Sequence, residues 1–323
     1  RCLHTLYFPE IHRRIDEIDD ADAKTFEWIL EPENHPQKGE QGLRFRNWLS
    51  NPDENANTFW ISGKPGAGKS TLMKYLADSS HLSTYLKDWS GDKEVIQVQY
   101  YFWRQGSRIQ RSLQGLLRSL LLQILSQHHD MIRTAFPDLE WQNYGLEFEF
   151  PEKSLTNALK KIVDAAEESH LYLFFLIDGL DEFDDREELD DALGDVEELL
   201  KFLSQFSSRK RIKLCVSSRT LNFLEERFSK YPQLCIRIDE ITQEDIRVYI
   251  RDELEENDIF RDLSRSNEEY LNIVQEMAHM AQGVFLWVRL VSKELRRLLT
   301  NGAQLRTLRE KLSEMPKEIE GFY

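Results

Sequence analysis

Apolar and polar residues alternate along the middle of the chain with two periods, one typical of strands and one of helices. Short runs rich in β-branched and aromatic residues predict five strands, at 58–62, 95–103, 172–177, 212–216 and 234–238. Apolar residues at helical spacing predict helices between them, at 72–77, 113–125, 155–166 and 189–203. This alternation predicts an α/β fold whose parallel five-stranded sheet is flanked by helices.

The two ends of the chain follow other patterns. Residues 1–57 mix short helical runs with Pro and Gly, so we expect an N-terminal helical linker that packs on the core. After Asp239 the strand pattern stops, and Thr242 with Asp245 predicts a capping box at the start of a helical region. We therefore expect an α/β domain over 58–239 and a small all-helical domain over 240–314. Residues 315–323 would begin a further, truncated region.

Composition narrows the class of protein. The chain has 323 residues, of which 41% are hydrophobic, enough for a large core. Acidic residues number 57 against 42 basic ones, a net charge of −15, which disfavours a nucleic-acid or anionic membrane surface. Three cysteines without metal-site spacing indicate a reducing, cytoplasmic location. The chain opens on Arg1, so we expect a fragment of a longer protein.

Much of the negative charge lies in one stretch. Between Asp178 and Glu198, twelve acidic residues stand against one arginine. Leu and Val form one stripe of this segment, so a solvated helix face is the main interpretation. The alternative is contact with a basic cluster in a head-to-tail ring. That cluster would be Arg209, Lys210, Arg211 and Lys213.

The strongest motif connects the first strand to the helix that follows. Its residues match the pattern GxxxxGK[ST] in full: Gly63, Lys64, Pro65, Gly66, Ala67, Gly68, Lys69, Ser70 and Thr71. In such a P-loop, backbone N–H groups and the helix N-terminus bind phosphates. Lys69 would bridge the β- and γ-phosphates, and Ser70 would offer its hydroxyl to Mg²⁺. The motif predicts a P-loop NTPase that binds ATP or ADP with Mg²⁺.

Further candidates follow two later strands. Asp178 ends a buried strand, where a P-loop enzyme places its second magnesium ligand. Asp181 and Glu182 come three and four residues later, and either could polarise the attacking water. Arg219 follows the strand at 212–216 and would contact the γ-phosphate. Capping or surface roles remain open for these side chains.

These residues resemble a known family. The P-loop, the run Asp178-Gly179-Leu180-Asp181-Glu182 and the run Ser217-Ser218-Arg219 are similar to the NACHT group of STAND NTPases. Phe102-Trp103-Arg104, the run 115–121 and the run 283–288 resemble the fungal NOD-like receptors, as does the segment around Phe26. The resemblance covers essentially the whole chain.

The resemblance implies a nucleotide switch. In that family an ADP-bound closed form exchanges to ATP, opens, self-associates and activates an attached effector domain. Its fungal members act in innate immunity and heterokaryon incompatibility. The implied partners are nucleotide and further copies of the chain, with no nucleic acid or membrane. Effector, sensor and winged-helix domains would lie outside the sequence, with 315–323 as the entry to the last.

The helical domain would cover adenine. Val284 and Trp287 are the candidates on one side of the base, and Phe26 or Trp28 on the other. Trp287 also fits a buried helix. Many NOD-like receptors carry Pro at the position that corresponds to Gly283, so this sequence departs from the family there.

Three functions therefore compete. The leading hypothesis is an ATPase switch with slow hydrolysis. A nucleotide-stabilised scaffold with negligible turnover is the second, and a mechanical ATPase of the AAA+ kind is the third. The second would hardly turn over, whereas the third needs sustained hydrolysis and an arginine finger supplied in trans.

Overall fold

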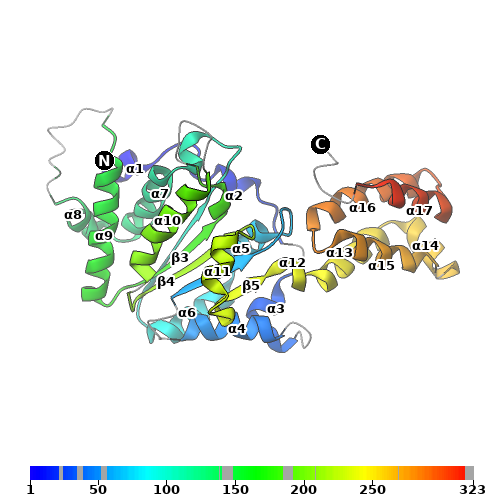
Figure 1. The fold of residues 1–323 in the computed structure, drawn as a ribbon, viewed down its shortest axis with the longest axis horizontal. Helices are drawn as coiled ribbons and strands as arrows, with labels where there is room; N and C mark the ends of the chain where they lie inside the picture. Colours follow the sequence, from blue (N-terminus) through cyan, green and yellow to red (C-terminus); the bar gives the residue numbers. More distant parts are fainter. Residues whose placement is uncertain are drawn as a thin grey trace. The chain divides into compact units, whose positions relative to one another are not determined.

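A computed structural model gives the fold as two compact units (Figure 1). It describes residues 1–21, 25–34, 39–51, 57–137, 139, 148–184, 192–207, 209–267 and 269–316. The α/β unit contains most of the chain up to Ile236. The helical unit contains the described residues from Arg237 on, together with Phe26 and the segment Ser62–Lys69.

The α/β unit is built on a five-stranded parallel sheet, as the sequence predicts. The strands lie in the order β2-β3-β4-β1-β5. Their bounds are Thr58–Ser62 (β1), Val95–Tyr101 (β2), Tyr172–Asp178 (β3), Ile212–Ser218 (β4) and Cys235–Arg237 (β5). Strand β3 pairs in parallel with both β2 and β4, so Tyr101 lies opposite Asp178. The first strand in the chain is thus inserted between β4 and β5.

Helices cover both faces of the sheet, and two neighbouring residues of β3 show why. Side chains alternate between the faces of a strand. Phe175 lies in an apolar cluster with residues of α7, α9 and α10. The ring of Phe174 packs at 6.1 Å against Trp48 of α4 on the other face. The strand is therefore apolar from Leu173 to Ile177 because it meets helices on both sides.

The helices of the α/β unit have the following bounds: Cys2–Leu6 (α1), Arg13–Glu17 (α2), Glu27–Leu30 (α3), Gly39–Ser50 (α4), Lys69–Asp78 (α5), Ser80–Ser90 (α6), Leu113–Gln127 (α7), Ile132–Ala135 (α8), Glu152–Ser169 (α9), Ala192–Ser207 (α10) and Asn222–Phe228 (α11). The α1 segment packs on α7 through Arg118, which donates to the carbonyls of Thr5, Leu6 and Tyr7 at 2.7–3.1 Å. These carbonyls end a helix and have no partner inside it.

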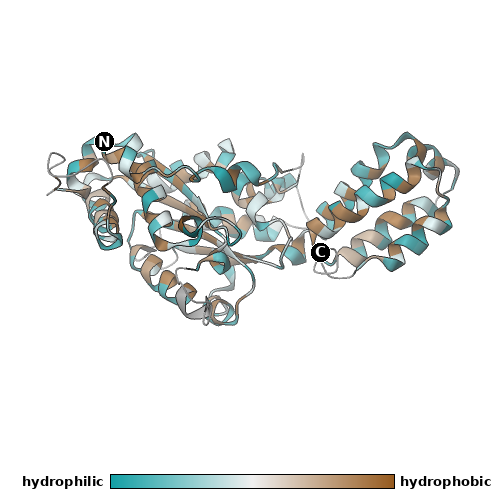
Figure 2. Cartoon of the chain, turned by 90° about the horizontal axis from the view of Figure 1, so that it is seen from above, coloured by the Kyte–Doolittle hydropathy of each residue, from teal (hydrophilic) through white to brown (hydrophobic). Residues whose placement is uncertain are grey.

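The helical unit contains α12 (Ile238–Ile241), α13 (Gln243–Glu255), α14 (Asp258–Ser266), α15 (Glu269–Ala281), α16 (Phe285–Thr300) and α17 (Leu305–Glu314). Apolar residues of these helices form one core, and Figure 2 shows brown stripes along the helices. Helix α6 is absent from the helices predicted between the strands, as are the short helices α8 and α11.

Two sequence interpretations are wrong in detail. The capping box at Thr242 is not formed. Helix α12 ends at Ile241 and leaves the backbone of Thr242 in a near-helical conformation. The hydroxyl of Thr242 is buried and has no partner among the described residues. Lys213 is 1% exposed, so it cannot belong to a basic surface cluster. Its ammonium donates to the carbonyls of Trp48 and Asn51 and lies over the rings of Trp48 and Trp89.

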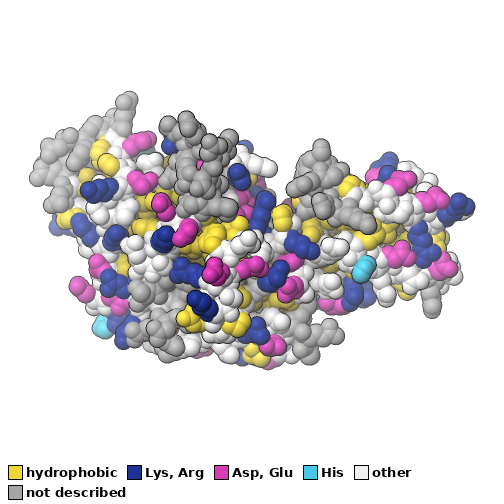
Figure 3. Space-filling view, in the orientation of Figure 1, with side chains coloured by type: hydrophobic (Ala, Val, Ile, Leu, Met, Phe, Trp, Pro, Cys, Tyr) yellow, Lys and Arg dark blue, Asp and Glu magenta, His cyan; other side chains and the backbone are white. Residues whose placement is uncertain are grey.

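The surface of the described residues carries mixed charge. Acidic and basic side chains are interspersed on the face drawn in Figure 3. Part of the acidic stretch, residues 185–191, lies outside the described residues, as do residues 317–323 of the expected winged-helix entry. None of the helices in the described part of the chain is long and apolar enough to cross a bilayer.

Candidate functional site

Asp178 ends strand β3 and is 2% exposed. The β3–β4 register pairs Ile177 with Val216, so Ser217 lies beside Asp178. The Ser217 hydroxyl donates to Oδ1 of Asp178 and accepts from the N–H of Gly179 at 3.1 Å. Gly179 has a φ of 72°, a left-handed conformation that favours glycine. The hydroxyl orients the carboxylate, and the chain turns directly after it.

Ser217 is a site residue that the sequence analysis quoted without giving it a role. Its position could have been found only from strand register, because the two side chains lie 39 residues apart in sequence. Two parallel strands that end level with each other bring such residues together.

The turn after Asp178 holds Asp181 against Arg219. The backbone N–H of Arg219 donates to Oδ1 of Asp181 at 2.8 Å, and its Nε lies 3.0 Å from Oδ2. The structure thus brings together two residues to which the sequence gave separate roles, one toward water and one toward the γ-phosphate.

Glu182 has different surroundings. Its Oε2 accepts a hydrogen bond from the backbone N–H of Arg104 at 3.0 Å. Burial raises the pKa of the Glu182 carboxyl above its ordinary value, the Arg104 bond lowers it, Asp178 and Asp181 raise it, and Arg14 lowers it. A carboxyl whose pKa is raised toward neutrality is a stronger base than an ordinary surface glutamate.

The P-loop has the form that phosphate binding requires. Gly66 and Gly68 have φ values of 70° and 92°, which only glycine adopts without strain. The ammonium of Lys69 donates to the carbonyls of Gly63 and Lys64, at 2.8 and 2.9 Å. These bonds close the loop on itself at the start of α5.

The loop is also bonded to the turn between α15 and α16. The N–H of Leu286 donates to the carbonyl of Gly66 at 3.1 Å, and Nζ of Lys64 donates to the carbonyl of Gln282 at 3.2 Å. Leu286 is in the first turn of α16, where N–H groups have no partner within the helix. The N-cap residue, Val284, supplies no side-chain bond, and the P-loop carbonyl takes that place.

Two aromatic rings lie against Gly68. A Cβ atom at this position would come within 3.3 Å of Phe26 and 3.6 Å of Phe285, whose ring centroids are 6.3 Å apart. Phe26 is 2% exposed and has a φ of 74°, a strained conformation for a bulky residue. The sequence pattern indicated Phe26 as an adenine contact but not Phe285. Helical periodicity marks an apolar position without saying what it contacts.

The other adenine candidates have different surroundings. Trp287 is 1% exposed in the helical core, and its Nε1 donates to the carbonyl of Pro316 at 2.6 Å. Val284 is only partly buried. Trp28 is fully buried in α3 and belongs to the α/β unit, whereas Phe26 belongs to the helical unit. Ser70 and Thr71 are half-buried in the first turn of α5.

The candidate residues fall in both units. Asp178, Asp181, Glu182 and Arg219 belong to the α/β unit, as do Ser70 and Thr71. The loop from Gly63 to Lys69 belongs to the helical unit. Within the sheet, β1, which leads into the loop, is the neighbour of β4, which leads to Arg219.

Comparison with the sequence profiles of known families identifies the family of this chain. The sequence profile described as "Nephrocystin 3, N-terminal" matches residues 24–219, more than half of the chain. The chain belongs to this family. The family match begins just before Phe26, includes the whole P-loop and ends on Arg219. Together with the sheet and the loop, it supports a P-loop NTPase.

Solved structures with a similar fold include Cdc6p from Pyrobaculum aerophilum, with 14% identity and a TM-score of 0.44 over 87% of this chain and 65% of that one. ORC2 of Aeropyrum pernix, in its ADP form, has 13% identity and a TM-score of 0.42 over 96% of this chain and 74% of that one. PCH-2 of C. elegans has 15% identity and a TM-score of 0.36 over 88% of this chain and 70% of that one. The chain thus spans about two thirds of the Cdc6p chain. Curated proteins give no match.

Proposed function

We propose that the chain is the nucleotide-binding module of a STAND-type switch of the NACHT group, in which MgATP binding and slow hydrolysis control self-association. Residues 58–239 would be the nucleotide-binding domain, and 240–314 the helical lid. The observation that carries the proposal is the attachment of the P-loop to the α15–α16 turn, through Gly66 and Lys64. A ligand that orders this loop also acts on the helices bonded to it.

The residues present fit Mg-nucleotide. The loop is preshaped, and Lys69 supplies the positive charge next to the phosphates. A serine hydroxyl and a carboxylate, those of Ser70 and Asp178, are oxygen ligands of the kind that Mg²⁺ takes beside phosphate oxygens. Bound Mg²⁺ would neutralise charge on the β- and γ-phosphates. Ser217 would keep the Asp178 carboxylate in one orientation.

The roles proposed for the remaining charged side chains of the site follow from the sign of their charge. Asp181 or Glu182 would orient the attacking water, and Arg219 would contact the γ-phosphate. Phe26, Val284 and Trp287 are the proposed contacts of adenine in the helical unit, with Trp28 as an alternative. A role of Trp287 would require its ring to leave the helical core.

The wider biological proposal is that of a NOD-like receptor. In that setting the module would act in the cytoplasm, in innate immunity or heterokaryon incompatibility, with effector and sensor domains elsewhere in the protein. Its partners would be nucleotide and further copies of itself.

A scaffold that binds nucleotide but hardly hydrolyses it is the second candidate. The pairing of Asp181 with Arg219 favours it, because it engages one of the two carboxylates that could orient the attacking water. Release of phosphate from ATP by the purified chain separates the two, since a scaffold releases almost none.

Replacement of Lys69 tests nucleotide binding. A ligand present at about 100 times its Kd stabilises the fold by about 2.7 kcal/mol. We expect ATP to raise the melting temperature of the wild type and of Lys160→Ala, an exposed control on α9. Lys69→Ala should lose this shift. Equal shifts for all three proteins would refute the P-loop assignment.

A further inference from the structure

Asp181 and Arg219 are joined by two contacts, and we call this pair the clasp. Asp181 lies in the single 3₁₀ turn Leu180–Glu182 after β3, and Arg219 is the first residue after β4. One carboxylate oxygen accepts from the backbone N–H of Arg219, and the other is 3.0 Å from its Nε. Both oxygens are thus engaged by one residue, which fixes its main chain and its side chain together.

The exposure of the two side chains is unequal. The Asp181 side chain is 10% exposed and that of Arg219 is 55% exposed. The Asp181 carboxylate contacts the guanidinium at Nε, which we call its inner edge; the two Nη atoms form its outer edge. Among the described residues neither Nη atom of Arg219 has a partner, so the outer edge of the guanidinium can still donate. A guanidinium held in this way presents two parallel N–H groups, which suit a phosphate.

The next residue is held by a different group. Glu182 accepts from the backbone N–H of Arg104, on the segment that follows β2. Among the described residues, the hydrogen bond donated by the Arg219 N–H and the ion pair of its side chain both go to Asp181. Two adjacent carboxylates therefore have different neighbours: one holds an arginine, and the other faces the segment that follows the edge strand.

We infer that Asp181 is a positioning residue for Arg219 and that Glu182 alone orients the attacking water. Asp181 would fix the guanidinium so that its Nη atoms can donate to the γ-phosphate, and it would contribute to hydrolysis and to the distinction between ATP and ADP only through Arg219. The inference rests on the proposed function and decides between the two carboxylates that the sequence left open. An ion pair with one exposed partner contributes little stability, so the clasp is better explained by position than by folding.

A double-mutant cycle tests this dependence. Single-turnover hydrolysis and the affinities for MgATP and MgADP would be measured for Asp181→Ala, Arg219→Ala, the double variant and Glu182→Gln. Loss of a charge-stabilising donor slows a reaction about 100-fold. We expect each single alanine variant to lose about that much and to lose preference for ATP over ADP. The double variant should be no slower than Arg219→Ala, since residues that act as a unit are not additive.

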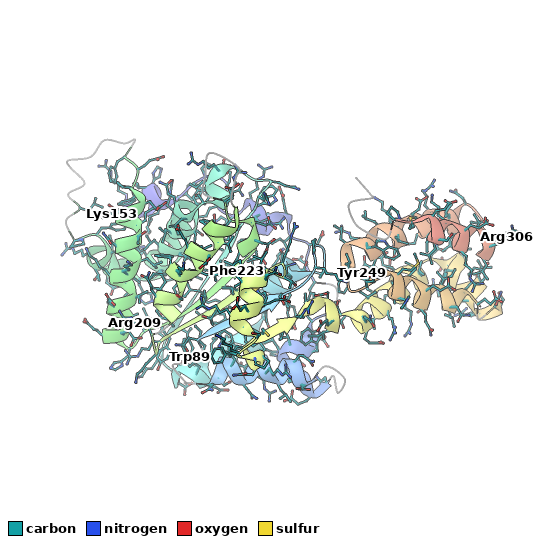
Figure 4. All side chains as sticks on the ribbon, in the orientation of Figure 1. Trp89, Lys153, Arg209, Phe223, Tyr249 and Arg306 are labelled. Carbon is teal, nitrogen blue, oxygen red and sulfur yellow. The ribbon has the colours of Figure 1, made fainter. Side chains whose placement is uncertain are left out.

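Glu182→Gln should behave differently. It should keep both affinities while hydrolysis slows by about 10²–10⁴-fold, the range for a general base. The matched control is Asp164→Ala, which breaks a 2.7 Å ion pair with Arg209 before the start of β4 (Figure 4). That variant should retain wild-type hydrolysis and affinities.

Two results would overturn the inference. The first is a double variant whose loss in rate equals the product of the two single losses. The second is Asp181→Ala with slow hydrolysis but unchanged preference for ATP, the signature of a water-orienting carboxylate. Should Asp181→Ala fail to fold, Asp181→Asn serves instead, because its amide oxygen can accept from the Arg219 N–H but its NH₂ cannot accept from Nε. If Lys69→Ala still binds ATP, the proposed function fails, whatever the cycle shows.

Discussion

At the scale of single residues, Glu182 shows how a site residue can cost stability. Its carboxyl is largely buried, and burial raises its pKa above the ordinary value of 4.5. The ionised form is therefore less stable in the folded chain than in the unfolded one. A residue whose ionised form lowers the stability of the fold is a candidate for a role in the reaction rather than in folding.

Glu182→Gln should raise the free energy of unfolding near neutral pH. Because the folded pKa is raised, the wild-type penalty is complete above that pKa. It fades as the pH falls and is gone below 4.5, where the carboxyl is protonated in both states. Chemical denaturation at several pH values measures the difference between variant and wild type.

The control for that comparison is Glu168→Gln, an exposed change on α9. It should give the same small difference from the wild type at every pH. A Glu182→Gln variant that is less stable than the wild type at neutral pH would contradict the expected gain in stability.

At the scale of elements, the α15–α16 turn depends on a glycine. Gly283 has a φ of 84°, and a Cβ there would lie 2.2 Å from the carbonyl oxygen of Asp239. Proline is fixed near a φ of about −65°, so it cannot occupy this position. The backbone of this turn therefore requires glycine at the position where the resemblance led us to expect proline.

A pair of glycine variants separates the cost of backbone strain from the cost of a steric overlap. Gly302 also has a positive φ, 78°, but no atom lies within 4 Å of its Cβ position. We expect Gly302→Ala to cost about 1–2 kcal/mol from backbone strain. Gly283→Ala should cost a further 1–3 kcal/mol or so, because the methyl group overlaps Asp239. Equal costs, measured by denaturant unfolding, would show that the close approach does not exist.

At the scale of the whole molecule, the P-loop groups with the helices rather than with the sheet that carries Asp178. Its bonds to Gln282 and Leu286 join segments more than 200 residues apart in the sequence. Under the proposed function, these bonds would link nucleotide binding at the P-loop to the helical unit.

Removal of the helical unit tests this link. A chain that ends at Ile236 loses both bonds to the P-loop, each worth about 0.5–1.5 kcal/mol. We expect its affinity for ATP to fall by about 10- to 100-fold, since 1.4 kcal/mol is tenfold. A chain that ends at Pro316 is the control and should bind as the full chain does. Circular dichroism checks that the shorter chain is folded, and an unchanged affinity would contradict the link.

The sequence by itself determined the features that local chemistry fixes. The five strands, the main helices and the P-loop lie within a few residues of their predicted bounds, because hydrophobic period and glycine content act over short stretches of chain. The position of Asp178 and Arg219 directly after predicted strands sufficed to expect each of them at the end of a strand.

Only the tertiary structure decided what those residues contact. The bond of Ser217 to Asp178 joins two strands, and that of Asp181 to Arg219 joins the segments that follow them. The burial of Lys213 depends on tryptophans of α4 and α6. The position of Phe285 against the P-loop is of the same kind. Such contacts are set by which elements pack together, and a periodic pattern marks a face without naming what will cover it.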